Sequence, residues 1–159
     1  GIIKRKYVRY FIAEFLISWY YICMKENLIH YRTCVCNINY HMVWSVKYRR
    51  KILNAEVEAY LQELVQEIAE DKGFTVHLFE CGEGDHVHCF VSAPPKLSIT
   101  AIMKYLKGIS GRKLFERFPE IRNQLWKGEL WNHSYYVETV GSVSEENIRR
   151  YIEHQSKAY

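Results

Sequence analysis

Apolar residues recur at helical spacing in two long stretches of the chain. Asn54 precedes the first stripe and Gly73 follows it, which is typical of a helix that is capped by the one and ended by the other. Ser98 begins the second helix, which we expect to run to about Phe118, with Gly108 and Gly111 weakening its middle. The stripe positions are Val57, Tyr60, Leu61, Leu64, Val65 and Ile68 in the first helix and Ile99, Ile102, Met103 and Leu106 in the second.

Four further stretches are rich in β-branched and aromatic residues and are predicted to be strands. They cover residues 34–46, 74–81, 86–93 and 130–140. A turn over residues 82–85 makes the second and third strands a hairpin, and a capping box from Ser142 to Glu145 begins a last helix. This order predicts an α+β fold: a ferredoxin-like, RRM-like βαββαβ antiparallel sheet with helices on one face and an added C-terminal helix.

Composition narrows the class of protein only slightly. The 159 residues are 48% hydrophobic and 25% charged, which suits one globular domain and argues against wholesale disorder. The net charge of +4 leans toward an anionic partner such as nucleic acid. Five cysteines without any Cys-x-x-Cys pair argue against a disulfide framework and favour a reducing cytoplasm.

The first 23 residues form a separate question. A basic start, Lys4 to Arg9, precedes an apolar run, but Glu14 interrupts that run and it is short for a membrane span. Met24 opens a more ordinary polar stretch. We therefore expect residues 1–23 to be a dispensable extension and residues 24–159 to form the single functional domain, with no membrane partner; an amphipathic helix on a membrane surface is the alternative.

Two histidines in the third predicted strand are the first candidates for chemistry. Alternate residues of a strand point to one side, so His86 and His88 project together and Val87 projects oppositely. Two imidazoles about 7 Å apart along a strand can converge on one cation. The same pattern also fits two polar residues on an exposed strand, so the pair needs a third group to become a site. Cys89 lies on the side of Val87, which disfavours a closed zinc site.

The last predicted helix supplies candidates for that third group. Ile148, Tyr151, Ile152 and Gln155 fall on one inward stripe. Tyr151 and Gln155 lie one turn apart and are therefore neighbours. Alone, they are more typical of a packed core tyrosine with a flanking glutamine. If the helix packs over the histidine face, two imidazoles and one amide oxygen would hold a metal ion with open positions.

Five blocks of sequence resemble, in order, the TnpA-type single-tyrosine HUH transposases of small prokaryotic insertion sequences. HUH denotes histidine, a bulky hydrophobic residue and histidine, which His86, Val87 and His88 match. The resemblance runs from about Met24 to Gln155. The blocks are residues 40–53, 84–95, 105–114, 130–141 and 150–155.

The resemblance implies specific roles for these residues. His86, His88 and Gln155 would bind a divalent metal, Mg²⁺ or Mn²⁺, and Tyr151 would be the nucleophile that forms a 5′-phosphotyrosine. The substrate would be single-stranded DNA with hairpins near the element ends. The protein would be a cytoplasmic prokaryotic homodimer, in which the tyrosine helix of one subunit can complete the partner's site.

Contacts to DNA phosphates are expected at two groups of basic residues. Tyr48, within the first group, offers a ring that can stack on an unpaired base. A solvated basic loop is the alternative. Asp85 either accepts a hydrogen bond that orients a histidine or is an ordinary turn aspartate. The candidates are Lys47, Tyr48, Arg49, Arg50 and Lys51 after the first strand, and Lys104, Lys107, Arg112 and Lys113 near the glycines.

Other functions remain open from the residues alone. A chromosomal relative acting on repeated palindromes would use the same chemistry. A non-catalytic ferredoxin-like binder of single-stranded nucleic acid would need only the aromatic residues and the basic loop. A small metal-dependent hydrolase would use the two histidines and release free products.

Overall fold

A single four-stranded antiparallel sheet organises the fold. The computed structural model describes residues 28–125, 128–141 and 150. The predicted extension over residues 1–23 lies outside this range, and so does the predicted last helix apart from residue 150. The sheet order is β4-β5-β3-β6, and every neighbouring pair is antiparallel. The strands are β3 (Asn39–Ser45), β4 (Thr75–Gly82), β5 (His86–Ser92) and β6 (Tyr136–Val140).

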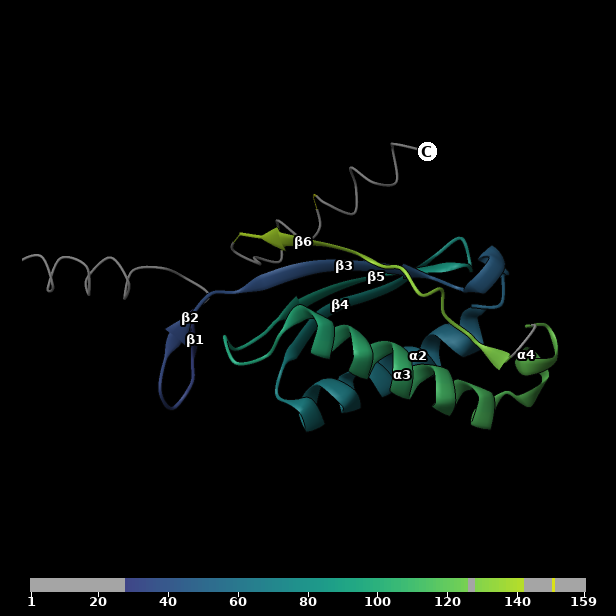
Figure 1. The fold of residues 1–159 in the computed structure, drawn as a ribbon, viewed down its shortest axis with the longest axis horizontal. Helices are drawn as coiled ribbons and strands as arrows, with labels where there is room; N and C mark the ends of the chain where they lie inside the picture. The colour runs from purple at the N-terminus through teal and green to yellow at the C-terminus, as the bar shows by residue number, and fades with distance from the viewer. Residues whose placement is uncertain (1–27, 126–127, 142–149, 151–159) are drawn as a thin grey trace, which may run out of the picture.

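Two long helices cover one face of this sheet (Figure 1). They are α2 (Ala55–Lys72), which joins β3 to β4, and α3 (Ile99–Arg117), which follows β5. The chain therefore runs strand, helix, strand, strand, helix, strand, and the predicted ferredoxin-like α+β arrangement is confirmed.

The ends of both helices follow from local hydrogen bonding. The Asn54 side chain accepts a hydrogen bond of 3.0 Å from the backbone N–H of Val57, and Gly73 ends α2 with a φ of 79°. Ser98 caps α3 in the same way, because its hydroxyl accepts from the backbone N–H of Ala101 at 3.1 Å. The predicted cap at Asn54, the predicted end of the first helix at Gly73 and the predicted start of the second at Ser98 are confirmed.

The core lies between the helices and the sheet. Five of the six predicted stripe positions of α2 are buried, and Tyr60 is partly buried against the same core. From the sheet, Met42 and Trp44 of β3 and Val87 and Cys89 of β5 point into this core. Alternation then sends His86 and His88 together to the opposite face, as the sequence predicted. Because α2 and α3 do not cover this face, we call it the open face.

Several elements differ from the prediction. The strand expected over residues 34–46 is divided into β3 and a short β2 (Val35–Cys36), which pairs with β1 (Ile29–His30) as a separate small hairpin. The strand expected from residue 130 begins only at Tyr136, although Trp131 forms an isolated bridge with Val46. The short helices η1 (Lys47–Arg49) and α4 (Pro119–Asn123) were not predicted. Across the described ranges, no helix is long and apolar enough to cross a membrane.

Candidate active site

The open face of the sheet carries a cluster of three imidazoles. His86 and His88 alternate along β5, and their ring centroids are 5.0 Å apart. His41 lies on the neighbouring strand β3, and its ring centroid is 5.4 Å from that of His88. His86 and His88 therefore lie close together on one face of the sheet. A third histidine, His41, which sequence analysis did not select, lies next to His88.

His86 is held on one side by the turn that precedes it. Its Nδ1 is 2.7 Å from a carboxylate oxygen of Asp85, which is only 4% exposed. The second oxygen of Asp85 accepts a 3.1 Å hydrogen bond from Arg49 Nε. Asp85 is thus a turn residue and also an acceptor that fixes the orientation of the ring.

His86 also packs over a glycine. Gly82 ends β4 and pairs with His86 in the sheet register. A Cβ at this position would lie 2.5 Å from Cε1 of His86 and would overlap Nε2. The missing side chain of Gly82 therefore leaves the space that the imidazole occupies.

His88 is held by a chain of hydrogen bonds across the sheet. Its Nδ1 is 3.1 Å from Nε2 of His41, and Nδ1 of His41 is 3.2 Å from a carboxylate oxygen of Glu138 on β6. The hydroxyl of Tyr136 donates to the other oxygen of Glu138 at 3.1 Å. His41 is 1% exposed and stacks on Phe90 at a centroid distance of 4.7 Å.

Electrostatics keep His41 and His88 in the neutral form near neutral pH. Burial, with the neighbouring rings of His41 and His86, lowers the pKa of His88 to about 4. Burial also lowers the pKa of His41, against the opposing effect of Glu138. A metal ligand must be a neutral imidazole, so this environment suits His88 for coordination.

The described residues supply two ligand atoms of the proposed metal site. Nδ1 of His86 and of His88 is occupied by a neighbour, and among the described residues neither Nε2 has a hydrogen-bond partner. Within residues 28–125 and 128–141, no group of three or more His, Cys, Asp and Glu side chains is arranged to hold a metal ion. Tyr151 and Gln155, the predicted nucleophile and third ligand, lie outside the described residues.

The cysteines on the other face do not compete for this role. Burial, with Glu58 and Glu80, raises the pKa of Cys81 to about 12, and burial also raises the pKa of Cys89. A thiolate is the form that binds metals, so neither residue is suited to coordination near neutral pH.

The basic loop after β3 is only partly available to a ligand. Lys47 forms an ion pair with Glu129, and Arg49 is bonded to Asp85. Tyr48 is 55% exposed, and it adopts a φ of 59°, which is unusual for a residue with a side chain. Arg50 and Lys51 are exposed. The loop therefore presents an aromatic ring and two cations to solvent.

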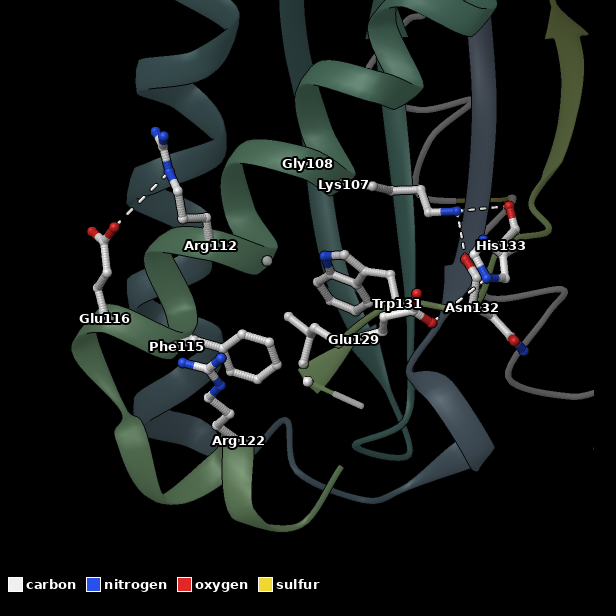
Figure 2. A pocket seen from close by; sticks show the side chains of 13 residues that line it. Lys107, Gly108, Arg112, Phe115, Glu116, Arg122, Glu129, Trp131, Asn132 and His133 are labelled. Atoms are coloured by element: carbon white, nitrogen blue, oxygen red, sulfur yellow. Dashed lines mark hydrogen bonds and ion pairs between the residues drawn. The ribbon is translucent and has the colours of Figure 1, made fainter. Parts of the chain in front are cut away.

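The second predicted basic group lies on α3 beside a pocket of about 640 Å³. Figure 2 shows Lys107 reaching across this pocket toward the loop before β6. Its ammonium donates to the carbonyl oxygens of residues 132, 133 and 134 at 2.5, 2.9 and 3.5 Å. Arg112 lines the same pocket, where it lies 3.9 Å from Glu116. Lys113 also lies 3.9 Å from Glu116, and Lys104 is exposed.

Three residues of the site were missed by sequence reasoning. His41 and Glu138 face each other across β3 and β6, and Gly82 faces His86 across β4 and β5. Alternation along the predicted first strand already placed His41 opposite Met42 and Trp44, on the side away from the core. Neither cross-strand neighbour could be found without the pairing register.

Comparisons with known proteins identify the relatives of this chain. The family model described as "Transposase IS200 like" matches residues 34–155. The chain is 37% identical to the ISDra2 transposase TnpA of Deinococcus radiodurans, over 85% of this chain and 96% of that protein. It is 34% identical to the transposase for insertion sequence element IS200 of Salmonella typhimurium, over 82% of this chain and 83% of that one.

Solved structures agree in fold. A crystal structure of a candidate transposase from Deinococcus radiodurans R1 superposes with a TM-score of 0.65 at 36% identity, and covers 83% of this chain and 98% of that chain. A tyrosine transposase bound to a REP hairpin superposes with a TM-score of 0.50 at 13% identity, over 81% of this chain and 68% of that chain, a likeness of fold alone.

Proposed function

This chain belongs to the family of IS200-like transposases, and from that premise we propose how it acts. It cleaves and rejoins single-stranded DNA at the ends of an insertion sequence, in a metal-dependent reaction. Tyr151 is the nucleophile, and His86, His88 and Gln155 hold Mg²⁺ or Mn²⁺. By the family resemblance, the active form is a homodimer.

The observation that carries this proposal is the convergence of His86 and His88 on the open face. Their ring centroids are 5.0 Å apart, and each Nδ1 is engaged by a neighbouring side chain. Two imidazoles fixed through Nδ1 offer Nε2 to a cation, which is the usual arrangement of metal-bound histidines. A pair of solvated surface histidines would not need partners that are 1% and 4% exposed.

A divalent metal at these ligands would neutralise charge on the scissile phosphate. This assistance matters because a free tyrosine has a pKa of about 10, so only about one in a thousand is phenolate near pH 7. An open coordination position is also needed for the substrate, which favours three protein ligands over a closed set of four.

The proposed cleavage is a transesterification. The phenolic oxygen of Tyr151 attacks the scissile phosphorus and forms a 5′-phosphotyrosine ester, while the bond to the 3′ oxygen breaks. That oxygen leaves with a proton as a 3′-OH, and the proton of the phenol passes to solvent. Attack by a different 3′-OH reverses the step and joins new DNA, so no nucleotide cofactor is consumed.

The basic loop after β3, which includes η1, is the proposed contact for unpaired DNA. Tyr48 is exposed and held in a left-handed conformation, as expected of a residue whose position is set by function rather than by packing. Its ring can stack on a base, and Arg50 and Lys51 can contact phosphates beside it. Hairpin DNA is the first substrate to test, since a protein of similar fold is bound to a REP hairpin.

The test is a covalent-adduct assay on the full chain. The protein is incubated with a labelled oligonucleotide that carries the element end and Mg²⁺ or Mn²⁺, and then denatured. We expect a protein–DNA band that Tyr151→Phe abolishes while hairpin binding persists. A band of equal intensity from Tyr151→Phe would refute the role of Tyr151. Binding without any adduct would indicate a non-catalytic binder, and free products without an adduct would indicate a hydrolase.

A further inference from the structure

His41 sits between Glu138 and His88 because of the register of three strands. It pairs with Glu138 on β6 and with Phe90 on β5, so His88, two residues before Phe90, is its diagonal neighbour on the open face. The ring planes of His41 and His88 differ by only 6°, which allows the proton and the lone pair of an N–H···N bond to point at one another. The result is one continuous line of hydrogen bonds, from carboxylate to imidazole to imidazole.

The protons in this line can be assigned by counting donors and acceptors. An ionised carboxylate only accepts, so Nδ1 of His41 carries the proton that Glu138 receives. A neutral imidazole has one N–H, so Nε2 of His41 is an acceptor. The proton between the two rings therefore belongs to Nδ1 of His88, and Nε2 of His88 keeps its lone pair.

The opposite assignment places two acceptors in contact. If Nε2 of His41 donated to His88, the lone pair on Nδ1 of a neutral His41 would face the carboxylate of Glu138 at 3.2 Å. His88 would then carry its own proton on Nε2, the atom that must be free to bind a metal ion. An acceptor–acceptor contact at a residue that is 1% exposed is costly, since water cannot relieve it.

We propose that His41 and Glu138 are positioning residues, which hold His88 in the Nδ1–H tautomer and so direct its Nε2 lone pair toward the divalent metal ion. This inference rests on the proposed function, because it takes His88 as a metal ligand. Asp85 plays the same part for His86 at 2.7 Å, but directly and from the neighbouring residue of the chain. His88 instead depends on two residues from two other strands.

The test measures metal binding and the tautomer, without DNA. Mn²⁺ is titrated into the metal-free full chain, and its Kd is determined from the electron paramagnetic resonance signal of free Mn²⁺. His41→Phe keeps the ring that stacks on Phe90 but removes both nitrogens, and we expect Mn²⁺ affinity to fall about 10-fold or more. His41→Gln places an amide oxygen near the former Nε2 and should recover part of this loss. Glu138→Ala should weaken binding in the same direction.

Nitrogen NMR of the metal-free protein reads the tautomer directly. Long-range ¹H–¹⁵N correlation distinguishes Nδ1–H from Nε2–H imidazole, and we expect His88 to be Nδ1–H in the wild-type protein. In His41→Phe, the Nε2–H form should appear. The control Val91→Ala loosens the same strand from its other face. It should keep the wild-type tautomer and Kd.

Three outcomes would overturn the inference. An Nε2–H tautomer of His88 in the wild-type protein would do so without any variant, even if His41→Phe failed to fold. A folded His41→Phe with wild-type tautomer and a Kd within about twofold of wild type would also do so, as would equal weakening in Val91→Ala. If His88→Ala itself bound Mn²⁺ normally, the proposed metal site would fail instead, so the two failures can be told apart.

Discussion

The two faces of the sheet differ in chemistry although the same strands supply both. On the face that α2 and α3 cover, β3 and β5 contribute Met42, Trp44, Val87 and Cys89, all at most 2% exposed (Figure 1). The intervening residues of β3 and β5 place imidazoles on the open face, where they bond to one another and to carboxylates of Asp85 and Glu138. The first face stabilises the fold through buried apolar area, and the second holds polar groups in fixed orientations.

A substitution is therefore expected to act on stability or on chemistry according to the face of the sheet on which its side chain lies. A half-buried polar group of the open face contributes little apolar area, so its loss removes ligand atoms more than folding free energy. The side chain of a residue on the covered face points away from the ligands, so its loss should have the opposite effect. Adjacent residues of one strand can test this separation.

The largest effect is expected when Val87 and His88, adjacent residues of β5 on opposite faces of the sheet, are substituted one at a time. His88→Ala should reduce covalent-adduct formation about 10³-fold or more, because a metal contribution of several kcal/mol to the barrier is lost, with a smaller loss of folding stability than in Val87→Ala. Val87→Ala, at a fully buried position, should lower the free energy of unfolding by about 2 kcal/mol and keep Mn²⁺ binding.

Adduct assays and urea denaturation on both variants measure these effects. Equal losses of stability in the two variants, with equal activity, would show that stability and metal binding are not separated between the two faces.

A second test concerns the glycine beneath His86. Gly82→Ala should weaken Mn²⁺ binding about 10-fold or more, because the new methyl group overlaps the imidazole and forces the ring away from Asp85. Gly108→Ala is the matched control, since a Cβ there meets nothing within 4 Å on an exposed turn of α3. It should raise the free energy of unfolding by about 0.5–1 kcal/mol, which urea denaturation measures, and leave Mn²⁺ affinity unchanged. Unaltered Mn²⁺ affinity in Gly82→Ala would mean that the ring has room to move.

Sequence patterns predicted the covered face far better than the open one. Periodicity and caps located α2 and α3 to within a residue or two, because those signals are local. Alternation placed His86 and His88 on one side for the same reason. The partners of these histidines come from register: Glu138 lies 97 positions after His41, and His41 lies 47 positions before His88. No local pattern encodes such pairs.

The predicted fourth strand shows how a long-range contact overrides local propensity. Residues 130–140 have strand-like composition, but the carbonyl oxygens of residues 132–134 are turned toward the ammonium of Lys107. The chain pairs with the end of β3 at an isolated bridge between Trp131 and Val46, and it forms the continuous strand β6 only from Tyr136. A lysine interpreted from sequence as a DNA contact thus holds the segment that leads to Glu138.

The smallest effect is expected at Lys107, which connects α3 on the covered face to the segment that leads to Glu138 on the open face. Lys107→Met keeps most of the aliphatic length but removes the charged donor, and we expect the free energy of unfolding to fall by about 1–2 kcal/mol because the carbonyl groups lose their partner. Lys104→Met, one turn earlier on α3 and exposed, is the matched control and should change stability by less than about 0.5 kcal/mol. Urea denaturation measures both, and hydrogen exchange at β6 localises the change.

If Lys104 contacts phosphates, the Lys104→Met variant should also weaken hairpin binding and reduce the salt dependence of that binding. A Lys107→Met protein with wild-type stability and wild-type exchange at β6 would show that the hydrogen bonds of Lys107 do not hold Glu138 in place. The strand β6 would then be positioned by its pairing with β3 alone.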